Sequence, residues 1–332
     1  MNESVIRTIS SEMNRYLNNY QMSKLNEVLY KRLDLDEKEI SNEEYLNKFI
    51  NSKRLEGCSN LTLKNYTIHV SKLFNYLNKD IRTMDTEDLR NYLSYYQSKN
   101  NCNNLTIDGV RRSLSSFFTF LEVEDYIVKS PVRRIHKIKT DILVKETYSD
   151  EVLEKLRNNC SNIRNLAIID LLASSGVRIS ELVNLNIEDI NFEEKSCVVF
   201  GKGKKMREVY FDGKTKLHLQ EYLDSRSDSN SALFVSLYKP YEKLKSRGIE
   251  LMLQRLGEKN GINKVHPHKF RRTLATRAID KGMPIEQVQH LLGHTKIETT
   301  LLYAMVNQNN VKNSHRKYIS WLYNSILQLI FM

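Results

Sequence analysis

The residues best suited to chemistry lie in the last third of this 332-residue chain. His268 and Arg271 are three residues apart in an Ala- and Leu-rich helical pattern that opens with Pro267, so both should lie on one face near a helix start. His294 follows downstream, and Tyr303 comes nine residues after it. An imidazole, a guanidinium and a phenol that converge are suited to phosphoryl transfer with tyrosine as the nucleophile.

The segment after His294 predicts where the tyrosine helix begins. It reads Thr295-Lys-Ile-Glu298, which fits a capping box and would put His294 at a helix N-terminus, a position that favours anions. His290 and His294 are also four residues apart, a spacing that could suggest zinc. We predict no metal, because no Cys or Glu partner motif accompanies them. A single His or Tyr is more often a packed or surface residue than a catalyst, so further residues must decide.

Those residues lie upstream. Arg178 follows a glycine in Ala-Ser-Ser-Gly-Val-Arg-Ile-Ser-Glu-Leu, and Lys202 lies in the glycine-rich segment Gly-Lys-Gly-Lys-Lys-Met-Arg. In chain order the candidates read Arg, Lys, His-x-x-Arg, His, Tyr. With these residues the sequence resembles the tyrosine recombinase (phage integrase) family, and its Xer-like members most.

The resemblance spans positions 41 to 303. It rests on Gly-Val-Arg-Ile-Ser-Glu-Leu, Gly-Lys-Gly-Lys-Lys-x-Arg, His-Lys-Phe-Arg-Arg-Thr-x-Ala-Thr, Leu-Leu-Gly-His and the tyrosine, all in family order. The spacings also suit the family: 24 residues from Arg178 to Lys202, 23 from Arg271 to His294, and 9 from His294 to Tyr303.

The resemblance implies a catalytic set of Arg178, Lys202, His268, Arg271, His294 and Tyr303. The two arginines would clamp a DNA phosphate, because planar guanidinium groups suit its non-bridging oxygens. His268 would help manage the proton that Tyr303 loses, while His294 would hydrogen-bond the phosphate. Lys202 would protonate the departing 5′ oxygen. Glu181 would orient the site, or be an ordinary helix-start residue. The product, a 3′-phosphotyrosine, could be resealed by a 5′ hydroxyl without metal, ATP or any other cofactor.

Composition sets the class of protein. A hydrophobic content of 40% with 27% charged residues is ordinary for a soluble globular chain. The formal charge of +11 favours a polyanionic partner over a merely solvated basic surface. The four cysteines are far apart and form no C-x-x-C pair, so we expect reduced thiols in a cytoplasmic protein. We find no secretory signal and no apolar run long enough to cross a membrane.

Patterning divides the chain into four parts. Residues 1–40 form a helical N-terminal extension. Residues 41–125 open with the capping box Ser41-Asn-Glu-Glu44 and carry four amphipathic helices. Residues 126–146 form a basic linker, which Pro131 and the lack of helical periodicity predict to be extended. Residues 147–332 form the catalytic domain.

The catalytic domain should be mixed. It shows helical patterns, among them one from Tyr241 to Glu258, and two strands, Ser196–Phe200 and Arg207–Phe211, whose turn carries Lys202. The fold class is therefore mainly α with a small antiparallel β-sheet (α+β). The resemblance identifies 41–125 as a helical, SAM-like core-binding domain and implies a C-shaped clamp on DNA. It also implies a terminal helix that docks on a neighbouring protomer, with packing on its own domain as the alternative.

Basic residues on polar segments are candidate contacts to the DNA backbone, with a solvated surface as the alternative reading. They are Lys64, Arg111, Arg112, Arg133, Arg134, Lys137, Lys139, Lys204, Lys205, Arg207 and Arg272, with Thr62 and Asn65 beside them.

The resemblance further implies double-stranded DNA with inverted recombinase-binding sites, a dimer on each site and a tetramer in synapsis, with room for a partner recombinase or accessory protein. One alternative is a type IB topoisomerase, which relaxes DNA as a monomer. Another is a non-catalytic site-specific DNA-binding regulator, which would not need Tyr303. Dimer resolution, phage integration and transposon or plasmid movement use the same residues; the N-terminal extension favours a mobile-element integrase.

Overall fold

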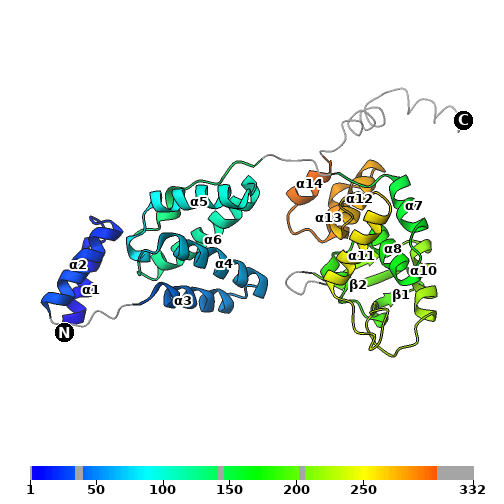
Figure 1. The fold of residues 1–332 in the computed structure, drawn as a ribbon, viewed down its shortest axis with the longest axis horizontal. Helices are drawn as coiled ribbons and strands as arrows, with labels where there is room; N and C mark the ends of the chain where they lie inside the picture. The colour runs from blue at the N-terminus through cyan, green and yellow to red at the C-terminus, as the bar shows by residue number, and fades with distance from the viewer. Residues whose placement is uncertain (1, 34–39, 141–145, 202–205, 305–332) are drawn as a thin grey trace, which may run out of the picture. The chain divides into compact units, whose positions relative to one another are not determined.

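The computed structural model describes residues 2–33, 40–140, 146–201 and 206–304. The chain forms two compact units, Met1–Ile142 and Leu143–Met332 (Figure 1). Lys202, Lys204, Lys205 and the predicted terminal helix lie outside the described residues.

The first unit is helical. Its elements are α1 (Asn2–Met13), α2 (Asn19–Arg32), α3 (Asn42–Leu55), α4 (Asn60–Leu77), η1 (Ile81–Thr83), α5 (Thr86–Asn100), α6 (Asn104–Val123) and η2 (Pro131–Arg134). The four predicted amphipathic helices, α3 to α6, are confirmed, and the Ser41 hydroxyl caps α3 in a capping box with Glu44. Their apolar faces meet in one core around Phe49, Leu73 and Phe117, all fully buried.

The basic segment after α6 differs from the prediction of an extended linker. It forms the short 3₁₀ helix η2, and Val132 is buried in the core of the first unit with Ile135 and Ile138 packed beside it. The backbone N–H of Ile138 donates to Asp108, and the Asn104 side chain donates to the carbonyl of Lys139. Apolar residues recur at every third position, Val132, Ile135 and Ile138, and this spacing indicates a segment that packs on the helices. Burial of these side chains is favourable, while the basic side chains between them stay exposed.

The second unit is larger and mixed. Its elements are α7 (Asp150–Asn158), α8 (Ile163–Ser175), α9 (Ile179–Leu182), η3 (Ile187–Asp189), β1 (Ile190–Asn191), β2 (Ser196–Phe200), β3 (Met206–Tyr210), α10 (Gly213–Asp224), α11 (Ser246–Lys259), α12 (Pro267–Asp280), α13 (Ile285–Leu292) and α14 (Glu298–Ala304).

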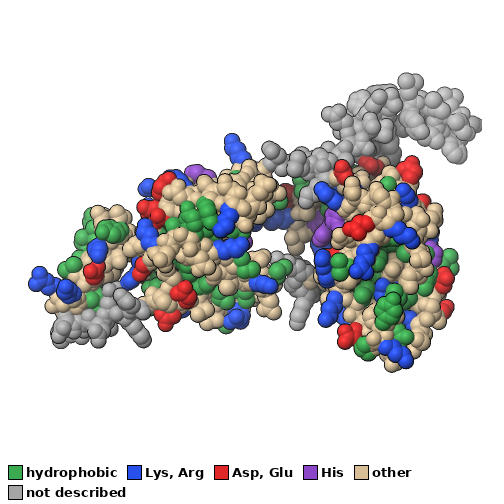
Figure 2. Space-filling model, viewed as in Figure 1, with side chains coloured by type: hydrophobic (Ala, Val, Ile, Leu, Met, Phe, Trp, Pro, Cys, Tyr) green, Lys and Arg blue, Asp and Glu red, His purple; other side chains and the backbone are tan. Residues whose placement is uncertain are grey.

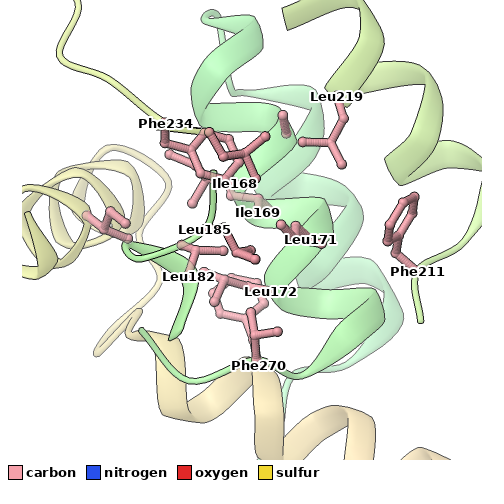
Figure 3. Close-up of a cluster of buried hydrophobic side chains, with 14 of the residues drawn as sticks. Ile168, Ile169, Leu171, Leu172, Leu182, Leu185, Phe211, Leu219, Phe234 and Phe270 are labelled. Carbon is pink, nitrogen blue, oxygen red and sulfur yellow. The ribbon is translucent and has the colours of Figure 1, made fainter. Parts of the chain in front are cut away.

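Helix α8 is the centre of this unit. Ile168, Ile169, Leu171 and Leu172 on successive faces are all fully buried, because α10 and α12 pack against the helix (Figure 3). Removing one such side chain would cost about 2–5 kcal/mol in unfolding free energy. Helix α8 ends at Gly176, which adopts a left-handed φ of +62°. This rigid helix therefore fixes where the following residues begin.

The sheet is a three-stranded antiparallel meander in the order β1-β2-β3. Both predicted strands are confirmed; β1, only two residues long, is too short to show an alternating pattern. In the antiparallel pair β2–β3, Cys197 pairs with Val209 on the buried face, and Phe200 pairs with Met206 at the end of the ladder.

Helix α11 begins at Ser246, five residues later than the sequence pattern suggested. The preceding residues are held in extended pairing instead: Val235 forms a bridge with Lys243, and Leu244 N–H donates to the Phe234 carbonyl. This non-local pairing overrides the local helical pattern.

Candidate active site

The first guanidinium of the site comes from the turn after α8. Arg178 is the N-terminal flanking residue of α9, with about a third of its side chain exposed. Its Nη1 donates to Glu181 Oε1 at 2.8 Å, and its Nη2 donates to the Gly293 carbonyl at 3.0 Å. Gly293 belongs to the predicted Leu-Leu-Gly-His segment, so these two sequence motifs meet in space.

The second guanidinium comes from α12. Arg271 is buried, and it donates to the carbonyl of Gly176 at 2.7 Å and to that of Leu292. Burial, together with the positive charges of Arg178 and Arg207, lowers the pKa of Arg271 to about 9. With a pKa of about 9, Arg271 still carries its positive charge at pH 7, and a buried cation of this kind favours a nearby anion.

Two histidines, His268 and His294, lie near these arginines. Desolvation and the charge of Arg271 lower the pKa of His268 below its usual value and that of His294 to about 4. Both imidazoles are therefore neutral at pH 7 in the DNA-free protein. His294 Nδ1 lies 2.9 Å from the hydroxyl of Thr300, which is fully buried. If that hydroxyl donates, Nε2 carries the proton and can donate to a phosphate oxygen.

Tyr303 lies on α14, next to His294. Its ring stacks on the His294 ring, with centroids 6.0 Å apart and an interplanar angle of 29°. It packs against the small apolar cluster of Ala275, Val288 and Leu292, which joins α12 to α13. Four predicted residues, Arg178, Arg271, His294 and Tyr303, are thus brought together, and the pKa effects of both arginines on His268 put it nearby.

The start of α14 corrects one prediction. Helix α14 begins at Glu298, three residues beyond Thr295, and its first main-chain bonds are accepted by Lys296 and Ile297. The capping box predicted at Thr295 is therefore wrong. His294 follows Gly293, whose left-handed conformation ends α13, so His294 lies in the connection between two helices instead of at a helix N-terminus.

Arg207, a predicted DNA contact, lies inside the site and is engaged by protein groups. Its side chain is only 12% exposed and forms a bidentate ion pair with Glu181, with Nη1 and Nη2 2.6 and 2.8 Å from the two carboxylate oxygens. Its Nε donates to the Leu291 carbonyl. Each of its three nitrogens thus has a protein partner, which fixes the guanidinium against Glu181 and the end of α13.

The remaining predicted DNA contacts fall into two groups. Lys64, Arg112, Arg133, Arg134, Lys137 and Lys139 are exposed. Arg111 is 14% exposed and pairs with the buried Asp108, while Arg272 is half-buried with an Nε that has no partner among the described residues. Figure 2 shows basic side chains scattered over the visible faces of both units, interspersed with acidic ones.

Thr300 was missed by sequence reasoning, because a threonine inside a helix gives no sign of which side chain it will contact. The four cysteines are free. Within the described ranges, no group of three or more His, Cys, Asp or Glu residues could hold a metal. No helix among those same residues is long and apolar enough to cross a membrane.

Comparison with known proteins decides the family. The phage integrase family model matches residues 145–310, and the model of the phage integrase N-terminal SAM-like domain matches residues 45–127. The chain belongs to the tyrosine recombinase (phage integrase) family. It is 33% identical over 285 residues to the tyrosine recombinase XerC of Leptospira interrogans, which covers 81% of this chain and 91% of that protein. It is 30% identical over 279 residues to XerC of Staphylococcus aureus, and this match covers 80% of this chain and 92% of that protein.

Solved structures show the same fold. The XerH recombinase bound to its difH substrate has a TM-score of 0.67 at 20% identity, with 94% of each chain covered. The Tn1549 transposon integrase in complex with a circular-intermediate DNA has a TM-score of 0.67 at 18% identity, covering 82% of this recombinase and 98% of that chain. A mainly helical fold with a small antiparallel sheet, predicted from the sequence, is confirmed. Members of this family are site-specific recombinases that cut and rejoin DNA.

Proposed function

We propose that this recombinase cuts DNA through a 3′-phosphotyrosine formed by Tyr303 and acts on inverted binding sites as a dimer, with two dimers in synapsis. The observation that carries the proposal is the phenol of Tyr303 stacked on a neutral imidazole beside two guanidinium groups. That arrangement supplies a nucleophile and a positive pocket for a phosphate.

In the proposed reaction the phenol oxygen attacks phosphorus and the bond from phosphorus to the 5′ oxygen breaks. Arg178 and Arg271 hold the non-bridging oxygens, which carry more charge as the transition state forms. The phenol proton must leave as the oxygen attacks, because a neutral phenol is a weak nucleophile, and the neutral His268 is available to take that proton. We assign His294 to hydrogen-bonding the phosphate and Lys202 to protonating the 5′ oxygen.

Reversal of the same step rejoins the DNA. The 5′ hydroxyl of another strand attacks the phosphotyrosine, so the energy of the phosphodiester is kept and no ATP or metal is required. The N-terminal helical unit, with its exposed basic side chains on α4, α6 and η2, would grip the duplex and complete a C-shaped clamp. We place the reaction in the cytoplasm and favour a mobile element as the source of the sites, because α1 and α2 extend the chain beyond the SAM-like module.

The test uses a plasmid with two copies of the DNA that flanks the encoding gene, incubated with the purified chain. Recombination between the copies, lost in Tyr303→Phe, would support the proposal. Relaxation of supercoiled plasmids without these copies, and no exchange between copies, would favour a type IB topoisomerase. Binding without either reaction would favour a DNA-binding regulator.

A further inference from the structure

Arg207 joins three segments that are distant in sequence. It lies on β3 opposite Val199 of β2, and its side chain turns toward α9 and α13. The guanidinium holds both oxygens of Glu181, while Nε donates to the carbonyl of Leu291 at 3.2 Å. One side chain thereby ties the hairpin to the start of α9 and to the end of α13.

The contacts of Arg207 continue into the phosphate pocket through Glu181. This carboxylate, 3% exposed, also accepts from the backbone N–H and from Nη1 of Arg178, both at 2.8 Å. Arg207 donates to both oxygens of Glu181, while the guanidinium of Arg178 donates to this carboxylate through Nη1 only. Nη2 of Arg178 is left to reach the Gly293 carbonyl.

The second contact of Arg207 with the site is made at the backbone of Gly293. A Cβ atom at this position would lie 2.8 Å from Cδ and 3.1 Å from Nε of Arg207, so the arginine packs directly on the glycine backbone. Gly293 is in the left-handed region with φ of +61° and immediately precedes His294. Arg207 therefore braces the backbone that presents His294 as well as the carboxylate that holds Arg178.

We propose that Arg207 is a positioning residue for the cleavage reaction, which sets the orientation of the Arg178 guanidinium through Glu181 and the position of His294 through the Leu291–Gly293 backbone. This inference rests on the proposed function. Without Arg207, Glu181 could take both Nη groups of Arg178 and draw the guanidinium away from Gly293. A lysine would keep the charge but not the three directed bonds.

A positioning role differs from a DNA-contact role in what it controls. A contact to a DNA phosphate adds about 0.9 to the slope of log affinity against log salt, and its loss weakens binding first. A displaced Arg178 guanidinium leaves ground-state binding of DNA intact and slows the chemical step, by about 100-fold for a displacement near 1 Å.

The experiment compares Arg207→Lys and Arg207→Gln with wild type in the full-length chain. The control is Arg226→Lys, which alters another buried arginine whose contacts are with Asp228, Asn230 and Ala232. Each protein is assayed for the salt dependence of duplex binding, for thermal unfolding, and for single-turnover cleavage of a nicked duplex taken from the flank that wild type cleaves. A second substrate carries sulfur in place of the scissile 5′ oxygen.

We expect both Arg207 variants to keep the wild-type salt slope and to cleave about 100-fold more slowly, while Arg226→Lys cleaves at the wild-type rate. Sulfur should not rescue them, although it should rescue Lys202→Ala, because a thiolate with a pKa near 8.5 leaves without protonation. A lowered salt slope would make Arg207 a DNA contact, rescue by sulfur would place it on the leaving-group side, and unchanged cleavage would leave it purely structural. Each of these results overturns the proposal.

A crystal structure of Arg207→Gln tests the same inference without activity. Arg178 should lose its hydrogen bond to the Gly293 carbonyl; an unchanged Arg178 would contradict the inference even in a protein that cleaves nothing. Absence of cleavage by wild type would instead count against the proposed function, so the two failures can be told apart.

Discussion

Removing the charge of Glu181 should destabilise the catalytic unit strongly. Glu181→Gln keeps the shape of the side chain but leaves Arg178 and Arg207 without a counter-charge. The carboxylate accepts four hydrogen bonds, at 2.8, 2.8, 2.6 and 2.8 Å. An amide has only one oxygen, and its NH₂ group would face an arginine N–H, so at least one donor is stranded.

The magnitude follows from the burial of the three groups. Removing one partner of a buried ion pair costs about 3–5 kcal/mol. Glu181 is buried, but the side chains of Arg178 and Arg207 are 30% and 12% exposed and can recover some hydration. We therefore expect the lower end, about 3 kcal/mol, which in a unit of this size lowers Tm by about 6–12 °C.

Differential scanning calorimetry at pH 7 checks this value. The matched control is Glu208→Gln, which alters an exposed carboxylate on β3 that accepts from the Tyr210 hydroxyl and should change Tm little. Hydrogen bonds from both arginines hold the pKa of Glu181 below its usual value, although burial opposes them. The stabilisation is thus complete above the unfolded pKa of about 4.3 and is lost as the pH falls through the lower folded pKa. The difference in Tm between wild type and Glu181→Gln should therefore disappear at acid pH. At pH 7, a Tm of the variant within about 2 °C of wild type would refute the reasoning.

Three further predictions concern other residues. Thr300→Val keeps the buried shape but loses the hydroxyl that holds His294, so single-turnover cleavage should fall about fivefold, the equivalent of about 1 kcal/mol; a wild-type rate would show that the contact does not orient the imidazole. The pKa of His294 is about 4 in the folded protein and near 6.5 in the unfolded chain, so urea denaturation should show the catalytic unit losing stability as the pH falls from 6.5 to 4. His294→Gln should lose less stability over that range; an equal loss in both proteins would count against this role of His294. Arg112→Ala, at an exposed position, should lower the salt slope of DNA binding by about 0.9. Arg111→Ala should chiefly lower the unfolding free energy, by about 1–3 kcal/mol, because the buried Asp108 loses its shortest ion pair and keeps only Arg112 and the Ile138 N–H; reversed effects would exchange the two roles.

Local patterns predicted the elements that hold the site. Periodicity and glycine positions predicted the helices that carry Arg271 and Tyr303 and the strands that come before and after Lys202, since these signals depend on neighbours in sequence. The motifs also indicated which residues should converge, and four of them do.

What the sequence could not show depends on partners far along the chain. Arg207 looked like one more basic residue beside a glycine-rich turn, and only the fold brings Glu181 and the Leu291 carbonyl to it. Thr300 became interpretable once His294 lay beside it. The segment at η2 folds onto the first unit because Val132 is buried there, and the high charge of the segment does not indicate this.

The central claim is that Tyr303 is the nucleophile, and a covalent-trapping assay tests it most directly. Wild type and Tyr303→Phe are incubated with nicked duplexes drawn from both flanks of the encoding gene, separated on a denaturing gel, and the adduct is digested to locate the modified peptide by mass spectrometry. The account predicts a protein–DNA band in wild type alone, with the DNA 3′ phosphate on Tyr303. An adduct that persists in Tyr303→Phe, or one carried by another residue, would contradict it.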